Sequence, residues 1–397
     1  MQLSRKCQNI QSSVTLAIDA KAKAMRAEGK NVVGFGAGEP DFATPQYIID
    51  AGIQALKDGK TKYTPAAGLP DLRKAVAKLT TQKLGIPCTF DQVVISTGAK
   101  QALFNALQVV CNPGDEVIVF SPYWVSYPEL IKMADATPVF VPTHVENGFA
   151  PDVEALKKAV TDKTKAIILN SPSNPSGAVF PESDLRAIAA IAEEKDLMII
   201  SDEIYDCLLY DGAKHFSVTQ ISESVRNRTI LINGMSKTYA MTGWRMGYSV
   251  SAPAVAKMMG SFQSHATGNA NTMTQYATLA AVSEENTEFG TMLKEFDARR
   301  RYMVETINAT PGLSAQMPKG AFYVMLNITE LLGKSWEGRK ITDSLSFADC
   351  LLDAKMTAVV PGGPFGLEGY VRLSYATSME NIVEGLKRIA AFAKEMK

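Results

Sequence analysis

The sequence lacks the cysteine and histidine groupings from which metal sites and disulfide frameworks are built. Among its 397 residues the three histidines lie far apart, and no Cys-x-x-Cys pair occurs among the five cysteines Cys7, Cys88, Cys111, Cys207 and Cys350. Because zinc sites and disulfide-rich folds need closely spaced ligands or pairs, we expect neither here. Scattered cysteines are typical of proteins in a reducing compartment, so we expect a cytoplasmic protein.

The sequence also lacks an excess of charge and any apolar run long enough to span a bilayer. Lysine plus arginine and aspartate plus glutamate both number 41, so the net charge is zero and no electrostatic argument favours nucleic acid or an anionic membrane. Met1 to Cys7 contain basic side chains with no apolar segment after them, which leads us to expect no secretory signal. The length favours two domains, or one large α/β domain with an appendage.

Apolar runs that end in polar residues or glycine indicate an α/β sheet in the first part of the chain. Strands are predicted at 92–96, 116–120, 166–169, 197–202 and 229–233, and helices at 14–28, 46–58, 70–85, 99–110 and 181–195. From 252 onward the pattern predicts helices at 252–264, about 275–308 and 379–395, with short strands at 313–318, 322–326, 357–360 and 370–375. This second pattern of helices and short strands is typical of an α+β domain.

Lys237 follows Ser236 at the end of the apolar run 229–232, and Arg245 comes shortly after it. A lysine that directly follows the end of a buried strand can lose hydration. This loss lowers its pKa and makes its amine a nucleophile toward a carbonyl. The neighbouring hydroxyls and Arg245 suit a phosphate, and an aldehyde cofactor that carries a phosphate is pyridoxal phosphate. Most lysines are solvated, so this run alone leaves a surface lysine open.

The nearly all-apolar run that begins at Leu197 ends on Asp202. Such a run is typical of a parallel strand covered on both faces, and the carboxyl ends of these strands present functional side chains. A buried carboxylate is costly unless a cation pairs with it, and a protonated pyridine nitrogen is such a cation.

Two glycine-containing turns are candidate ligand loops. After Val33 the chain enters a glycine-rich turn in which Glu39 stands where a dinucleotide motif needs its third glycine, so that motif is excluded. A backbone that approaches a ligand at Gly38 and a simple turn both remain open. Gly98 and Ala99 lead from a strand directly into a helix, where free N–H groups bind phosphate, although such turns are common.

Two side chains stand beyond the ends of predicted strands. Trp124 follows the strand 116–120, where its ring faces a ligand or packs in the core. Asn174 lies in a proline-rich loop and can donate a hydrogen bond, and its bond to Pro175 is a candidate cis peptide.

Three further residues have a functional and an ordinary interpretation. Arg372 interrupts an apolar strand, where it binds a carboxylate or faces water at a sheet edge. Lys100 stands at a helix N-terminus that disfavours a cation, so it either meets an anionic ligand or is simply solvated. Tyr63 lies among small residues in a loop, a setting more typical of a surface aromatic.

In order and spacing, these residues resemble the class I aminotransferases of fold type I, a pyridoxal-phosphate family, and most closely the bacterial aspartate aminotransferases. The likeness covers essentially the whole chain, from the Gly38 loop to Arg372, and rests on the motifs Asn174-Pro175, Ser201-Asp202-Glu203-Ile204-Tyr205, Ser236-Lys237 with Arg245, and Arg372. It implies an α/β large domain whose mostly parallel, seven-stranded-type sheet is flanked by helices, and a smaller α+β domain. We expect residues 1–45 to join the small domain, 46–290 to form the large domain and 291–397 to form the small domain.

The resemblance also implies a role for each candidate. Lys237 would be the Schiff-base lysine and proton carrier, Asp202 would pair with the pyridinium nitrogen, and Tyr205 would complete the catalytic set. The other implied cofactor contacts are the backbone of Gly98 and Ala99, the ring of Trp124, the side chains of Asn174, Ser236 and Arg245, and Tyr63 from the neighbouring subunit of a homodimer. The implied substrate contacts are Gly38 and Arg372 at the α-carboxylate, and Lys100 with Thr15 at the distal carboxylate. Trp124 and Asn174 are implied to contact the substrate as well.

The implied activity is transamination between L-aspartate and 2-oxoglutarate by a ping-pong mechanism. Aminotransferases with aromatic, alanine or prephenate specificity stay open, as do the C–S lyases and cyclising synthases of the same fold. Ligand-sensing domains of transcription regulators share the fold too, but those carry a basic helix-turn-helix segment ahead of it, which we do not expect here.

Overall fold

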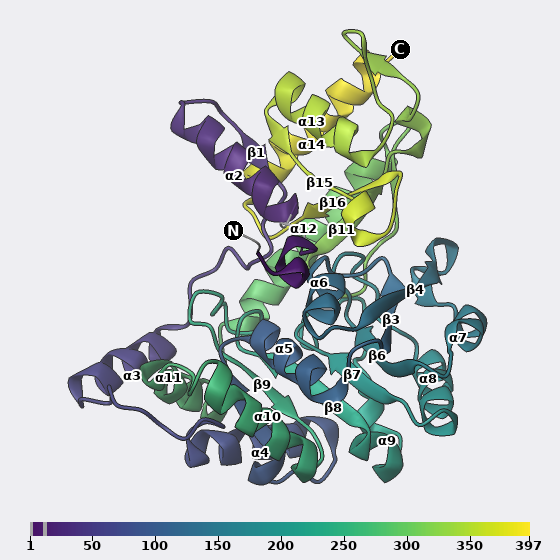
Figure 1. Cartoon of the computed structure of the whole chain (residues 1–397). Coiled ribbons are helices and arrows are strands. Elements are labelled where there is room, and N and C mark those ends of the chain that lie inside the picture. The colour runs from purple at the N-terminus through teal and green to yellow at the C-terminus, as the bar shows by residue number, and fades with distance from the viewer. Residues whose placement is uncertain (1–2, 11–13) are drawn as a thin grey trace.

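An eight-stranded sheet forms the centre of the larger part of the molecule (Figure 1). The computed structural model describes residues 3–10 and 14–397. The sheet order is β2 (Val93–Ser96), β9 (Gly247–Val250), β8 (Thr229–Gly234), β7 (Met198–Asp202), β6 (Thr164–Asn170), β3 (Glu116–Ser121), β4 (Thr137–His144) and the two-residue β5 (Ala150–Pro151). Strands β8, β7, β6, β3 and β4 run parallel, and β9 and β5 pair antiparallel with their neighbours. The predicted mostly parallel sheet is confirmed.

Alternating side chains of the central strands enter separate hydrophobic cores on the two faces of the sheet. Ala166 and Ile168 of β6 pack with α5 (Ala99–Val110), α6 (Ser126–Met133) and α10 (Pro253–Ala266). Ile167 and Leu169 pack with α7 (Val153–Ala159), α8 (Glu182–Glu194) and α9 (Glu223–Asn227). Burial on both faces is why these strands are apolar throughout.

A third core covers the end of the sheet at β2 and β9. It joins α3 (Gln46–Lys57), α4 (Pro70–Leu84) and α11 (Thr272–Ser283). The ends of α4 are explained by local sequence: Pro70 occupies the first turn, where its missing N–H costs nothing, and Gly85 adopts a left-handed φ of 66° as the C-cap.

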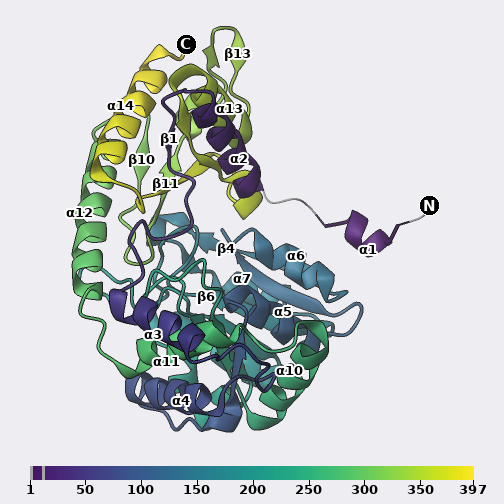
Figure 2. The same ribbon diagram turned by 90° about the vertical axis from the view of Figure 1, so that its left-hand side faces the viewer.

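The remaining elements build a smaller body around the antiparallel sheet of β10 (Ser314–Ala315), β11 (Tyr323–Asn327), β16 (Tyr370–Ser374) and β15 (Val360–Pro361). Helices α12 (Phe289–Asn308), α13 (Ser344–Lys355) and α14 (Met379–Glu395) pack on it. Helix α2 (Val14–Ala27) lies beside α13 in both views (Figures 1 and 2), and its Ala22 packs on Leu352. The short strand β1 (Val33–Gly34) pairs with β14 (Thr357–Ala358). The domain boundaries at 45/46 and 290/291 stay a prediction.

Several predicted elements differ from the observed ones. The helix predicted at about 275–308 is two helices, α11 and α12, because the helical structure is interrupted between Ser283 and Phe289. The strand predicted at 313–318 is reduced to β10, and the strand predicted at 357–360 is divided into β14 and β15. Strand β4, whose sequence contains the two prolines Pro138 and Pro142, was not predicted. Within the described residues, no helix is long and apolar enough to cross a membrane.

Candidate active site

A cavity of about 710 Å³ lies where β6, β7 and β8 end and where β16 of the smaller sheet approaches them. Residues distant in sequence meet there because the carboxyl ends of neighbouring parallel strands lie at one edge of a sheet. The predicted site residues that line it are Gly38, Ala99, Lys100, Trp124, Asn174, Asp202, Tyr205, Ser236, Lys237, Arg245 and Arg372.

Lys237 extends from the segment that follows β8, and its Nζ donates a hydrogen bond to the carbonyl oxygen of Gly38. Desolvation lowers the pKa of Lys237 to about 8, and the nearby Arg372 and Arg245 act in the same direction, against Glu39. A lysine with this pKa holds a useful fraction of neutral amine near neutral pH and can act as a nucleophile or base.

Asp202 is 4% exposed at the end of β7. Its Oδ2 accepts a hydrogen bond from the Tyr127 hydroxyl at 2.7 Å, and its Oδ1 accepts one from the N–H of Ile204 at 3.3 Å. Burial raises the pKa of Asp202 to about 6, although both hydrogen bonds act to lower it. The carboxyl group therefore has donors but forms no salt bridge with any residue that the structure describes, which suits a cationic ligand.

Gly98 and Ala99 form a close-packed turn at the start of α5. Gly98 has a φ of 84°, and a Cβ there would lie 2.4 Å from the guanidinium of Arg245. A Cβ at Gly247 of β9 would lie 2.3 Å from the backbone nitrogen of Ala99. Only glycine at positions 98 and 247 lets the turn, β9 and Arg245 approach one another this closely. The buried Ser236 belongs to the same cavity wall. The N–H of Gly98 donates to the carbonyl of Ser96 at 2.8 Å, so the N–H groups at the start of α5, beside the guanidinium, are the ones suited to a phosphate.

Arg372 projects from β16 and is 3% exposed. Its guanidinium donates to Asn174 Oδ1 and to the carbonyl of Gly36, both at 3.0 Å, and lies over the ring of Tyr323 at 4.5 Å. Burial lowers the pKa of Arg372. Its Nε has no hydrogen-bond partner, and it pairs with no carboxylate in the described chain. The edge-strand alternative is wrong, because the side chain faces the cavity instead of water.

Two hydrogen bonds fix Asn174, one at its side-chain oxygen and one at its backbone N–H. Its Oδ1 accepts from Arg372, and its backbone N–H donates to Asn170 at 2.8 Å, so the side-chain amide nitrogen remains a donor toward the cavity. The Asn174–Pro175 bond is cis, as predicted. The hydroxyls of Tyr205 and Tyr323 lie 3.0 Å apart, and both residues line the same cavity as Asn174.

Trp124 and Lys100 line the same wall. The ammonium of Lys100 lies 4.8 Å from the centre of the Trp124 ring, and the ring of Tyr127 meets Trp124 edge-on at 5.4 Å. Burial, and then Arg245, lower the pKa of Lys100. The lysine thus lines the cavity while its side chain stays exposed, and its contact with an anionic ligand stays a prediction.

Of the predicted contacts, Gly98 and Tyr63 are not among the residues that line this cavity, although Gly98 directly precedes Ala99, which does; Thr15 cannot be placed there either way. The side chain of Tyr63 is 98% exposed and is not part of the cavity wall. Thr15 belongs to α2, but its side chain lies outside the described part of the structure. All three contacts stay predictions.

Sequence reasoning missed Tyr127 and Tyr323, which contact Asp202 and Tyr205. Neither residue follows a strand end or a glycine turn: Tyr127 lies in the first turn of α6 and Tyr323 begins β11. A signal for Tyr127 existed only in its closeness along the chain to Trp124, which lies just before α6.

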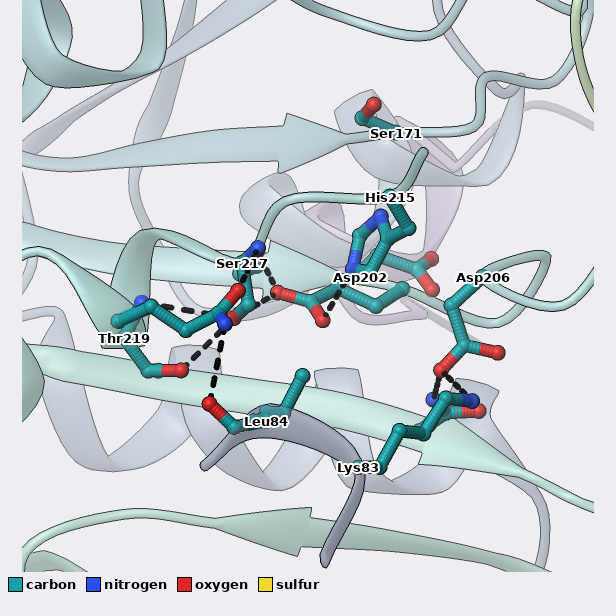
Figure 3. Close-up of polar contacts among 12 residues, drawn as sticks. Lys83, Leu84, Ser171, Asp202, Asp206, His215, Ser217 and Thr219 are labelled. Carbon is teal, nitrogen blue, oxygen red and sulfur yellow. Dashed lines mark hydrogen bonds and ion pairs between the residues drawn. The ribbon is translucent and has the colours of Figure 1, made fainter. Parts of the chain in front are cut away.

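A group of polar contacts holds the segment that follows β7 (Figure 3). Glu203 binds His215 Nε2 at 2.7 Å and accepts hydrogen bonds from Ser201 and Ser217. Asp206 forms a 2.6 Å ion pair with Lys83 of α4 and accepts from Asn233 of β8 at 2.7 Å. These contacts involve residues that do not line the cavity, and they anchor the segment to α4 and β8. They hold in place the turn that carries Asp202 and Tyr205.

Comparison with known proteins gives consistent matches over the chain. The family model described as "Aminotransferase class I and II" matches residues 30–389. The chain is 44% identical to an aspartate aminotransferase of Bacillus sp. strain YM-2, over 99% of both sequences. It is 44% identical to an aspartate/prephenate aminotransferase of Thermus thermophilus, over 98% of both. The crystal structure of an aspartate aminotransferase from Rhizobium meliloti superimposes with a TM-score of 0.96 at 37% identity, covering 100% of each chain.

Proposed function

The chain belongs to the class I and II aminotransferases, and on this basis we propose that it exchanges the amino group between L-aspartate and 2-oxoglutarate, forming oxaloacetate and L-glutamate. The observation that carries the proposal is the placement of a buried arginine and a second cation in one cavity with Lys237. Arg372 lies deep in the cavity and Lys100 lies against Trp124. A dicarboxylate has an anionic group for each.

We propose pyridoxal phosphate as the cofactor, because the residues present fit its three polar parts. The turn at Gly98 with Ser236 and Arg245 suits the phosphate, and the buried Asp202 suits a cationic ring nitrogen. The Asn174 amide and the Tyr205 hydroxyl suit the ring oxygen. When bound, this cofactor supplies an aldehyde that condenses with amines and a ring that accepts electrons.

In this proposal, Lys237 binds the cofactor in the resting enzyme and moves the proton to and from the substrate Cα. Its pKa of about 8 supports both roles, because the neutral amine attacks a carbonyl and accepts a proton without a large energetic cost. Arg372 holds the α-carboxylate in a two-pronged contact, and Asn174 fixes the orientation of the guanidinium.

One cavity serves both substrates, so we propose a ping-pong order in which oxaloacetate leaves before 2-oxoglutarate enters. Both oxo acids and both amino acids have the same two carboxylates, so Arg372 and Lys100 serve each in turn. The ping-pong order predicts parallel lines in double-reciprocal plots of initial rate at several fixed concentrations of the second substrate.

We propose a homodimer in which Tyr63 reaches the phosphate site of the neighbouring subunit. The 98% exposure of this aromatic side chain supports the idea, since an exposed tyrosine on an ordered loop is available to a partner. Sedimentation of the wild-type protein tests the assembly, and we expect a dimer. A titration with pyridoxal phosphate should show that Tyr63→Phe binds the cofactor more weakly than wild type. A fully active monomer would refute the proposal. A cytoplasmic location is also proposed, supported by five free cysteines.

The experiment that tests the function uses Lys237→Ala with a panel of donors. The wild-type protein is expected to gain visible absorption on addition of pyridoxal phosphate and to convert aspartate faster than alanine or phenylalanine. The variant is expected to lose both properties. Turnover by Lys237→Ala at the wild-type rate would refute the assignment of this amine, and equal rates with aspartate and alanine would refute the dicarboxylate assignment.

A second amino acceptor is supported by the relatives named as aspartate/prephenate aminotransferases, among them that of Thermus thermophilus. Prephenate also has two carboxylates, so it presents the same anionic groups to Arg372 and Lys100. Adding prephenate as an amino acceptor to the same assay separates an aspartate-specific enzyme from one with both activities.

A further inference from the structure

The hydroxyl of Tyr127 makes the shortest hydrogen bond to the Asp202 carboxyl group within the described structure, at 2.7 Å. Tyr127 is 2% exposed, and its ring is fixed edge-on against Trp124 at an angle of 86°. It lies 75 positions from Asp202 in the sequence. The contact therefore depends on α6 packing against the strand end of β7.

Each oxygen of Asp202 has its own donor. Oδ2 accepts from Tyr127 and Oδ1 accepts from the N–H of Ile204 at the longer distance of 3.3 Å. The other charged or titratable groups that act on Asp202 are Glu203, which follows it, Lys237 and the hydroxyl of Tyr205. Glu203 disfavours the ionised carboxyl group and Lys237 favours it, so Tyr127 is the neutral group that both orients and stabilises the anion.

We propose that Tyr127 is a positioning residue, which holds the Asp202 carboxylate in its ionised form and turns it toward the ring nitrogen of the cofactor. The inference rests on the proposed function, because it assigns Asp202 to that nitrogen. Removal of the hydroxyl leaves a buried carboxylate oxygen without its strongest donor, and the neutral acid is then favoured.

The test compares Tyr127→Phe with Tyr210→Phe, a matched control. Tyr210 is 3% exposed, and its hydroxyl makes a 2.7 Å hydrogen bond to the carbonyl of Ala321 outside the cavity, next to the hydroxyl of Tyr375. Both variants remove one buried phenolic oxygen and keep the ring. A general loss of stability should therefore affect the two melting temperatures similarly.

The readout is the affinity of the cofactor-free protein for pyridoxal phosphate as a function of pH. In wild type the affinity should fall as the pH drops through the pKa of Asp202, about 6, because protonation removes the charge that pairs with the ring. In Tyr127→Phe the affinity at neutral pH should fall about tenfold, as expected for a hydrogen bond to a charged group, and the midpoint should move to higher pH. Tyr210→Phe should match wild type in both.

A further variant, Asp202→Asn, removes the titrating group. In this background Tyr127→Phe should add no pH dependence. Wild-type affinity and midpoint in Tyr127→Phe, or the same change in Tyr210→Phe, would overturn the inference while leaving the aminotransferase assignment intact. Failure of the wild-type protein to bind pyridoxal phosphate at all would instead overturn the proposed function.

Discussion

Replacement of Lys100 by alanine should change substrate preference and not the chemistry of the site. The side chain ends over the Trp124 ring, 4.8 Å from its centre, and lines the cavity that also holds Arg372. If its ammonium meets the distal carboxylate, the loss is that of a hydrogen bond between charged groups, about 1.5–3 kcal/mol. This corresponds to about a tenfold to hundredfold lower kcat/KM for aspartate, with phenylalanine nearly unaffected.

The stability of the variant gives an independent check on this reasoning. Lys100 stands in the first turn of α5, where the helix dipole disfavours a cation by about 0.3–1 kcal/mol. Lys100→Ala should therefore unfold at the same temperature as wild type or a higher one, although its activity toward aspartate falls. Lys74→Ala, which removes an exposed lysine from α4, serves as the control.

The assay measures kcat/KM for aspartate and for phenylalanine in wild type, Lys100→Ala and Lys74→Ala. An unchanged aspartate-to-phenylalanine ratio in Lys100→Ala would refute the contact and leave the preference for aspartate dependent on the relatives alone. An equal loss with both donors would mean that Lys100 supports the cavity wall and not the substrate.

Three further predictions concern the support of the site. Gly98→Ala should weaken pyridoxal phosphate binding at least tenfold in a titration of the cofactor-free protein, since the added methyl lies 2.4 Å from a guanidinium nitrogen and φ is 84°. Lys83→Met should lower the free energy of unfolding in urea by about 3–5 kcal/mol, because it leaves the carboxylate of Asp206 buried and unpaired. Burial alone lowers the pKa of His215, but Glu203 outweighs it and the net pKa is raised, so its contribution is complete below about pH 6.5 and is lost as the pH rises through the folded-state value. His215→Gln should flatten that alkaline decline in unfolding experiments, and an unchanged decline would contradict the assignment.

The strand-end residues were predictable because their signals are local. Asp202 ends an apolar run, and Lys237 follows the end of another. Parallel strands buried on both faces are apolar throughout, so a polar residue at their end marks the edge where ligands bind. The turn at Gly98 was predictable for a similar reason, since a strand, a glycine and a helix follow one another directly.

The partners of these residues were not predictable from local patterns. Tyr127 and Tyr323 lie inside regular elements, 75 and 118 positions from the residues they contact, and aromatic side chains at such positions usually belong to the core. The orientation of Arg372 likewise depends on β16 approaching the larger sheet, where Asn174 and Gly36 accept its hydrogen bonds.

The sequence by itself determined the mostly parallel sheet, the family and most of the residues that line the cavity, because strand periodicity, glycine turns and the ordered motifs are carried by neighbouring residues. Only the tertiary structure decided the charge states and orientations at the site. The pKa of Lys237 falls to about 8 and that of Asp202 rises to about 6 because the assembled walls exclude water from both groups. Desolvation is a property of the packed chain, and no spacing of residues along the sequence records it.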